Sequence, residues 1–354
     1  MKFFHYILMM LLLSLLFSCE KEPSLEAARN PISFSPSVSV ETKALSPVDS
    51  TNLICNNNQV HIFGVRTYDT NQKENVFPAN QDLVCSISGP NTTWNYSPLV
   101  NWKETGTYYF AGVYPYNSNG GASLNTTTYQ ISVPYAAGDN KDVMLARQSR
   151  TMGTPNATRP VNLVFNHACS AVRFLFGTAQ GSDVYYLTDF RVEGVYGNGT
   201  LSAPLITSDP NDPNPGVFPA NWSRSGSRTN LFSWEANIAQ SRNPVRVAHP
   251  SNQNDPDGYT NSAVFGQWFY MVPQQMDASS AIRFSISHNA DGSNPFTTLM
   301  SITDRDGIPG ADSWIPNRVY NYYIILNQKL VTIYVKTTDW DVVQVTTDDL
   351  TFSD

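Results

Sequence analysis

The chain of 354 residues is long for one domain, so two domains are the first expectation. It carries 22 Lys plus Arg, no basic run and a net charge of -7. Because binding to nucleic acid requires clustered cations, this composition argues against a nucleic-acid partner. Charged residues make up only 14% of the chain, and Asn, Ser and Thr supply the polarity, which is typical of an exported β-rich protein.

Residues 1–18 have the pattern of a signal peptide. Lys2 is followed by an apolar run over residues 7–17, which is too short to span a bilayer. The run ends in Leu16-Phe17-Ser18-Cys19, which resembles a bacterial lipobox, although Phe17 departs from the small or β-branched residue of the strictest pattern. We therefore expect lipidation of Cys19, a polar tether over residues 19–30, and a protein anchored to a membrane. The alternative is an ordinary signal peptide with a coincidental cysteine.

Three further cysteines remain, Cys55, Cys85 and Cys169. No C-x-x-C spacing occurs, so the pattern does not indicate a zinc site. We expect all three to be free and mostly buried, with a Cys55–Cys85 disulfide as the main alternative.

Alternating apolar residues predict strands throughout the first half of the chain. The first run is PISFSPSVSV at residues 31–40, and the next is residues 58–69, with a bulge expected at Gly64. Similar runs follow at residues 82–89, 105–116 and 128–135. No stretch shows sustained helical periodicity, so an all-β sandwich is expected.

A Gly- and Pro-rich stretch between residues 150 and 160 is the best candidate for a domain boundary. It predicts an N-terminal β-sandwich over residues 31–155 and a C-terminal one, with long loops, over residues 156–354. Near the end, residues 319–326 and 330–336 predict a hairpin around a turn at residues 327–329, and DVVQVTTDDLTF at residues 341–352 predicts one more strand.

No catalytic, phosphate-binding or metal-binding motif appears in the sequence. His61 and His167 fall in predicted strands and are interpreted as core residues. The Asp-Gly loops at residues 254–260 and 303–313 lack the first ligand and the final glutamate of a calcium loop. The sequence therefore predicts no enzyme, no cofactor and no metal.

Four features together resemble the fimbrillin-like lipoproteins of Bacteroidota, the subunits of type V pili. They are the lipobox with its acidic continuation, the early strand ISFSPSVSVETKAL at residues 32–45, the run VNLVFNHACSAVRFLF at residues 161–176, and a W-x-P…Y-x-Y…W hairpin at residues 314–340. Asn317 stands where that family usually has glycine, but Asn also tolerates a left-handed backbone.

The resemblance implies two transthyretin-like Greek-key β-sandwich domains in tandem and an outer-membrane lipoprotein at the cell surface or in a fimbrium. It also implies that a trypsin-like protease cuts near the first strand, after Lys43 or Arg29. The removed strand would carry Ile32, Phe34, Val38 and Val40. Its groove would be filled by a strand from a neighbouring subunit, for which Val343 and Val345 are the candidates.

The implied partners are other fimbrial subunits, a membrane through the lipid, and a host or bacterial surface ligand. The acidic pair Asp348-Asp349 makes the donor strand imperfect, so a tip or anchor role stays open. A surface glycan-binding lipoprotein that accompanies a sugar importer is the alternative. A lipoprotein hydrolase ranks last because no catalytic motif appears.

Overall fold

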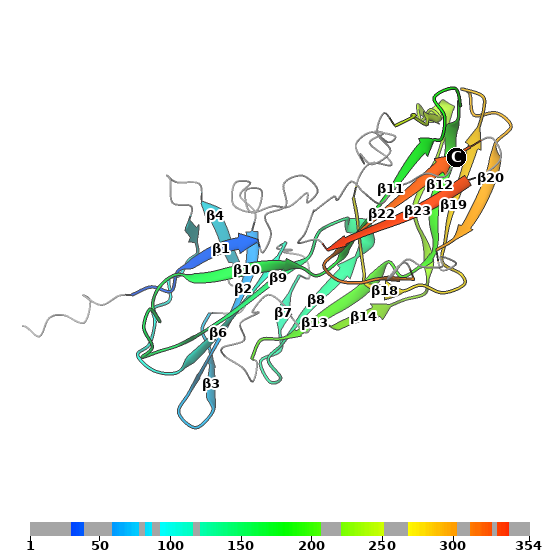
Figure 1. The fold of residues 1–354 in the computed structure, drawn as a ribbon. Coiled ribbons are helices and arrows are strands. Elements are labelled where there is room, and N and C mark those ends of the chain that lie inside the picture. Colours follow the sequence, from blue (N-terminus) through cyan, green and yellow to red (C-terminus); the bar gives the residue numbers. More distant parts are fainter. Residues whose placement is uncertain are drawn as a thin grey trace, which may run out of the picture.

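The computed structural model describes residues 30–38, 59–77, 82–86, 93–115, 121–206, 221–250, 268–302, 312–327 and 331–339. Within these ranges the chain forms strands and two short 3₁₀ turns, Ala137–Asp139 and Ile238–Gln240, which confirms the all-β class (Figure 1). Among the same residues, no helix is long and apolar enough to cross a membrane.

An eight-stranded sheet forms one end of the elongated molecule, with the strand order β1-β10-β9-β6-β2-β4-β5 and β3 paired to β2. Its strands are β1 (Phe34–Val38), β2 (Gln59–Tyr68), β3 (Gln72–Asn75), β4 (Asp82–Ser86), β5 (Thr93–Asn95), β6 (Thr107–Tyr114), β9 (Met144–Thr151) and β10 (Val161–His167). The neighbouring pairs are antiparallel except for β1, which runs parallel to β10.

The central strands of this sheet, β2 and β6, are buried on both faces, because apolar side chains point to either side of them. On β2, Val60 and Ile62 join one core cluster, whereas Phe63 and Val65 join another. The bulge expected at Gly64 is wrong, since β2 keeps unbroken register with β6 on both sides of it. A Cβ at Gly64 would lie 2.7 Å from Cε2 of Phe77, so glycine is required there for close packing of that ring.

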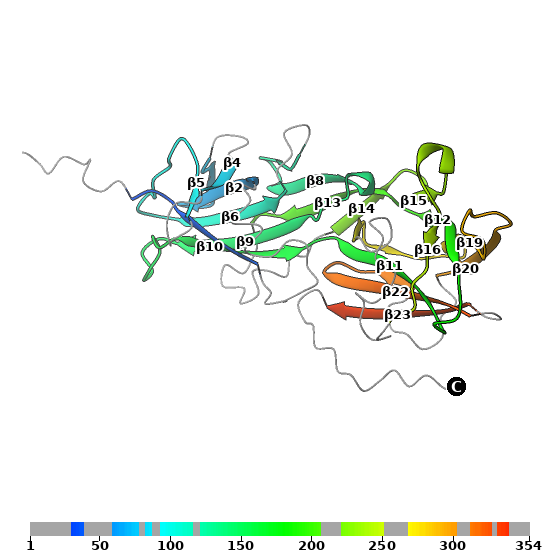
Figure 2. The ribbon, with the colours of Figure 1, turned by 90° about the horizontal axis from the view of Figure 1, so that it is seen from above.

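A four-stranded sheet in the middle of the molecule joins strands that are far apart in the sequence (Figure 2). It has the order β14-β13-β8-β7, with β7 (Ser123–Leu124), β8 (Gln130–Ala136), β13 (Asn198–Pro204) and β14 (Asn221–Ser225). Val133 of β8 pairs with Leu201 of β13, and both side chains lie in the same cluster as Phe63 and Val65. This sheet therefore joins one face of the first sheet to the second sandwich in a single core cluster, whereas the other face of the first sheet packs a separate cluster.

The other end is a sandwich of two sheets. One sheet has the order β17-β11-β22-β23 and the other β15-β12-β19-β20, with β16 paired to β12. The bounds are β11 (Ser170–Thr178), β12 (Tyr186–Val195), β15 (Thr229–Glu235), β16 (Val245–Arg246), β17 (Phe269–Met271), β19 (Ala281–Ser287), β20 (Phe296–Ser301), β22 (Arg318–Leu326) and β23 (Val331–Asp339). Aromatic rings fill the interface: the ring centroids of Phe174 and Phe190 are 5.0 Å apart, and those of Phe176 and Phe284 are 5.3 Å apart.

The hairpin expected near the end of the chain is confirmed as the antiparallel pair β22 and β23. Just before it, β21 (Ser313–Trp314) pairs with β18 (Gln274–Gln275). The buried indole Nε1–H of Trp314 donates a hydrogen bond to the hydroxyl oxygen of Tyr322, at 2.9 Å. The backbone N–H of Ile315 donates to the hydroxyl of Tyr320, also at 2.9 Å. The tryptophan and tyrosines of this motif are thus linked by hydrogen bonds.

Two further expectations about single residues are confirmed. Asn317 has a φ of +59°, in the left-handed region that glycine or asparagine adopts most readily. Cys169 is free and fully buried. Cys55 lies outside the described residues, so the expectation that Cys55 and Cys85 are free stays a prediction, with a Cys55–Cys85 disulfide as its alternative.

The strand that follows the expected boundary at residue 155 does not leave the first sheet. After a run of turns, β10 returns to pair with both β9 and β1, and the chain enters the second sandwich only at β11. The division into two domains at residue 155 stays a prediction, and β10 extends the first sheet to His167.

Candidate functional site: the first strand and a charged pocket

The N-terminal segment Asn30–Val38 forms hydrogen bonds with the chain at both ends of the first sheet. Phe34–Val38 pairs in parallel with β10, with Phe34 opposite Val161 and Val38 opposite Phe165. Just upstream, the N–H of Ile32 donates to the carbonyl of Val100 at 2.8 Å, and the N–H of Trp102 donates to the carbonyl of Asn30 at 3.0 Å. The segment therefore joins β10 at one end of the sheet to the chain that follows β5 at the other.

The side chains of this segment belong to the core. Ile32 is 1% exposed and Phe34 is 2% exposed. The Phe34 ring meets Phe77, Tyr96 and Phe110 at centroid distances of 6.0, 6.0 and 5.4 Å. The hydroxyl of Tyr96 also donates to the carbonyl of Ile32, at 2.8 Å. Removal of the segment would expose an aromatic groove and the unpaired edge of β10.

The structure brings together part of the set of residues expected from the sequence. Ile32 and Phe34 are described in full, and Val38 is described by its backbone in β1. The others lie outside the described residues: Cys19, Arg29, Val40, Lys43, Val343 and Val345.

A buried polar cluster lies where the first sheet leads into the second sandwich. Nδ1 of His167 is 2.7 Å from a carboxylate oxygen of Asp142, and both side chains are buried. Cys169 lies close by, and burial raises the pKa of its thiol well above the usual range. A nucleophilic cysteine needs an accessible thiolate, so Cys169 is a core residue rather than a reactive one. No group of three or more metal-ligating side chains occurs within the described ranges.

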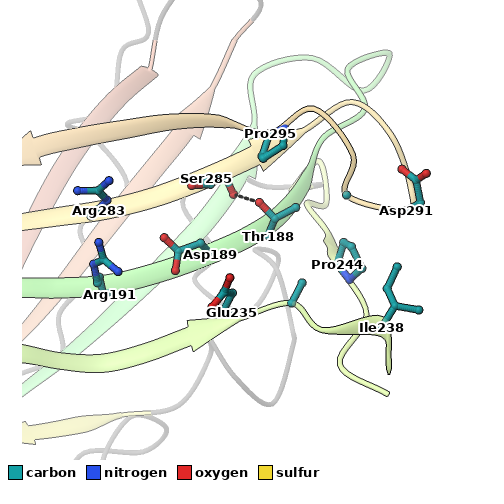
Figure 3. Close-up of a pocket in the computed structure, with 12 residues that line it drawn as sticks. Thr188, Asp189, Arg191, Glu235, Ile238, Pro244, Arg283, Ser285, Asp291 and Pro295 are labelled. Carbon is teal, nitrogen blue, oxygen red and sulfur yellow. Dashed lines mark hydrogen bonds between the residues drawn. The ribbon is translucent and has the colours of Figure 1, made fainter. Parts of the chain in front are cut away.

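A pocket of about 520 Å³ lies on the outer face of the β15-β12-β19-β20 sheet (Figure 3). Its floor carries charged side chains from three strands, and its rim is formed by the turns that follow them. The lining residues are Thr188, Asp189, Arg191, Glu235, Ala236, Ile238, Pro244, Arg283, Ser285, Asp291, Gly292 and Pro295. Figure 3 shows Asp189 and Glu235 between the two arginines on one side and Ile238 and Pro244 on the other.

The surroundings of Asp189 in this pocket disfavour the charged form of its carboxyl group. Partial burial raises its pKa above the usual range; Arg191 opposes that shift, and the nearby Glu235 adds to it. Asp189 lies directly opposite Glu235 on the neighbouring strand. No ion pair between described residues includes either of these two carboxylates.

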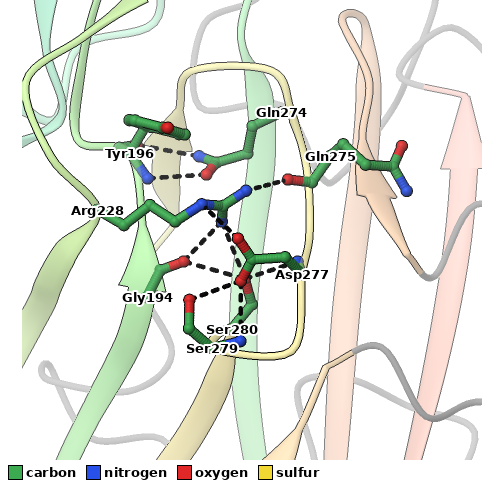
Figure 4. Close-up of polar contacts among 8 residues, drawn as sticks. All are labelled: Gly194, Tyr196, Arg228, Gln274, Gln275, Asp277, Ser279 and Ser280. Atoms are coloured by element: carbon green, nitrogen blue, oxygen red, sulfur yellow. Dashed lines mark hydrogen bonds and ion pairs between the residues drawn. The ribbon is translucent and has the colours of Figure 1, made fainter.

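A second charged group, around Arg228, is a structural clamp rather than a site (Figure 4). Its guanidinium donates to the carbonyls of Gly194 and Gln275, both at 2.7 Å, and pairs with Asp277 at 2.8 Å. Hydrogen bonds from Ser279 hold the pKa of Asp277 below its usual range. The charges in this group satisfy one another, and the clamp fixes the bend at Gly194, whose φ is +66°.

No motif marks the pocket residues in the sequence. The available signal is the alternation in DFRVEG, where Asp189, Arg191 and Glu193 face outward while Phe190 and Val192 enter the core. That pattern reveals a charged outer face. It does not reveal Glu235 or Arg283, because these residues come from strands that only the fold brings alongside.

The chain matches a protein family by its sequence and several solved structures by its fold. The family model described as fimbrillin-like matches residues 42–340. A fimbrial protein from Bacteroides vulgatus shares 12% identity and a TM-score of 0.54, over 87% of this chain and 99% of that one. A Bacteroides uniformis protein assigned to cell adhesion shares 11% identity and a TM-score of 0.53, over 88% and 98%.

At identities this low, the two structures show a likeness of fold alone. Among curated proteins, none matches the sequence. The family model, however, spans most of the chain, including every described strand from β2 to β23. The protein therefore belongs to the fimbrillin-like family.

Proposed function

We propose that this protein is a non-catalytic fimbrial (type V pilus) subunit or adhesin, exported as an outer-membrane lipoprotein and assembled by protease-triggered strand exchange. One observation carries the proposal: Asn30–Val38 closes the first sheet while burying Ile32 and Phe34 in its core. The family is one of fimbrial and cell-adhesion proteins, which implies a place at the cell surface or in a fimbrium. It does not favour the alternative of a glycan-binding lipoprotein beside a sugar importer.

The position of the cut decides what happens to the first strand. Arg29 precedes Asn30, so a cut after Arg29 would leave the whole Asn30–Val38 segment attached. Lys43 follows β1 in the sequence, so a cut after Lys43 would separate the segment from the rest of the chain. Only the second cut would let the groove open, as strand exchange requires.

A strand from a second subunit would then replace the lost one. Its main chain would pair with the edge of β10, and its side chains would enter the pockets left by Ile32 and Phe34. Val343 and Val345 have the same spacing of two residues as Ile32 and Phe34, so both would face the groove. Such a contact joins unlike surfaces and does not close on itself, which builds a filament.

Limited proteolysis with an enzyme that cuts after Lys and Arg tests the exchange. The wild-type chain and the control Arg29→Gln should both yield a new N-terminus at Ala44 and a ladder of oligomers. Lys43→Gln should yield neither product. A clean cut after Lys43 that leaves the protein monomeric would refute strand exchange.

Metabolic labelling with a palmitate analogue tests the anchor. Wild-type cells should label the protein and retain it in the membrane fraction, whereas Cys19→Ala should abolish both. Cys55→Ala is the matched control and should keep the label. Labelling of Cys19→Ala would show that the lipid is attached elsewhere.

A further inference from the structure

The strand register sorts the pocket floor into two rows of like charge. Asp189 lies opposite Glu235 on β15, and two residues along β12, Arg191 lies opposite Arg283 on β19. Like charges directly opposite one another on neighbouring strands destabilise a sheet. Each row therefore requires a compensating charge.

Within the described chain, only the arginine row makes a close ion pair, although Arg191 and Arg283 also act on Asp189 at longer range. A carboxylate oxygen of Glu193 lies 2.8 Å from Nε of Arg191 and 3.7 Å from a terminal guanidinium nitrogen of Arg283. The lining holds three carboxylates and two guanidinium groups, so its net charge is -1, and with Glu193 it is -2. A net negative pocket favours a cation and disfavours an anion.

The rim adds an apolar wall beside the carboxylate row. Ile238 is 56% exposed, and it lies with Pro244 on the same side of the pocket (Figure 3). None of the 12 lining residues is aromatic, so the pocket offers no ring on which a sugar could stack. The volume of about 520 Å³ falls within the usual range for ligand pockets and exceeds that of a single ion.

We propose that this pocket binds a lysine side chain presented by a peptide segment of a partner protein. The ammonium lies between Asp189 and Glu235, where it neutralises the carboxylate row. The aliphatic stem packs against Ile238 and Pro244, as lysine stems do along apolar surface. The unused N–H groups of Arg191 and Arg283 donate to main-chain carbonyls of the same segment.

This site is separate from the strand-exchange edge. Asp189 and Glu235 lie on strands at the far end of the molecule from β1 (Figure 1). The proposal does not depend on strand exchange, and its test uses the uncut chain.

The test is the binding of a peptide labelled with fluorescein through its N-terminus, fluorescein-Gly-Ala-Lys-Ala-Gly-amide, to the full chain by fluorescence anisotropy. Asp189→Asn/Glu235→Gln should weaken binding about tenfold or more, because each lost partner is a charge-assisted hydrogen bond. The control Asp69→Asn/Glu104→Gln removes the same charge from exposed positions in turns beside the first sheet and should change binding by less than about twofold. Thermal melts establish that both variants fold.

A second peptide, in which the lysine is acetylated, distinguishes specific recognition of the ammonium group from non-specific binding. Acetylation removes the charge and keeps the stem, so binding should fall about tenfold. Equal binding of the two peptides would overturn the proposal, as would wild-type affinity in the pocket variant. Failure of the lysine peptide at millimolar concentration, alongside binding of calcium or a neutral oligosaccharide that the pocket variant abolishes, would assign the pocket to another ligand class.

Discussion

Arg66 and Arg228 show how single residues fix the geometry of each end of the molecule. Arg66 donates to the carbonyl and the hydroxyl of Thr105, at 2.7 and 2.8 Å, and to Glu74 at 2.8 Å. Lys103 also pairs with Glu74, at 2.7 Å. These bonds hold the β2–β3 hairpin against the loop that leads into β6. In both clusters a planar guanidinium reaches several acceptors at once, which lysine cannot do.

Arg228→Lys should lower the free energy of unfolding by about 1–3 kcal/mol, because the carbonyls of Gly194 and Gln275 lose their donors. Urea denaturation measures the change. The matched control Arg159→Lys replaces an exposed arginine and should shift stability by less than about 0.5 kcal/mol. Equal effects of the two substitutions would show that the clamp contributes nothing.

Glu74 should make stability depend on pH. Its hydrogen bond from Lys103, helped by Arg66, holds the pKa of this carboxyl below its usual value. A lowered pKa in the folded state stabilises the protein above the unfolded pKa, and that stability is lost as the pH falls through the folded pKa. Glu74→Gln should thus cost about 0.2–1 kcal/mol at pH 7, as for other partly exposed ion pairs.

The cost of Glu74→Gln should disappear in acid, once the wild-type carboxyl is protonated as well. Thermal melts from pH 7 to pH 3 measure this, with the exposed Glu104→Gln as control. A constant difference between wild type and Glu74→Gln across that range would contradict an ionic contribution.

At the scale of elements, β1 has a special place among the strands. Among the described strands, it pairs on one side only, with β10, and the hydrogen bonds of Asn30 and Ile32 complete the closure of the sheet. Its alternation, read from the sequence, correctly predicted a strand with Ile32 and Phe34 buried. Its parallel pairing with a strand more than a hundred residues away could not be read from the sequence, because pairing depends on which edge the folded sheet leaves open.

Phe34→Ala should destabilise the protein by about 3–5 kcal/mol, the usual cost of removing a buried aromatic ring. Chemical denaturation measures it. Ser35→Ala changes the next residue of the same strand, whose side chain is exposed, and should have an effect below about 0.5 kcal/mol. A small effect of Phe34→Ala would mean that β1 adds little to the core, and strand removal would then open no groove.

On the scale of the whole molecule, the proposed assembly edge and the lysine pocket lie at opposite ends (Figure 1). Ile32 and Phe34 belong to one core cluster, and the strands under the pocket belong to another, which reaches the first sheet through β8 and β13. The two functions should therefore fail independently, because no residue is shared between them.

A chain that lacks residues 341–354 should still be cut after Lys43 and should still bind the lysine peptide, but it should form no oligomers, since the candidate donor strand is gone. Asp189→Asn/Glu235→Gln should show the reverse: normal oligomers and weak peptide binding. Size-exclusion chromatography after proteolysis and fluorescence anisotropy measure the two properties. Loss of both properties in either variant would contradict their independence.

Local sequence patterns are enough to predict the all-β class, the burial of Ile32, Phe34 and Cys169, and the β22–β23 hairpin, and the family resemblance adds the left-handed Asn317. These features follow from local alternation, from turn chemistry and from backbone preferences, all of which depend on residues that are close in the sequence. The folded arrangement was needed to show that β10 belongs to the first sheet, that Gly64 makes room for Phe77, and that β1 closes the sheet. It alone placed Glu235 beside Asp189 and Arg283 beside Arg191, because strand register over long separations depends on the packing of the whole core rather than on any local pattern.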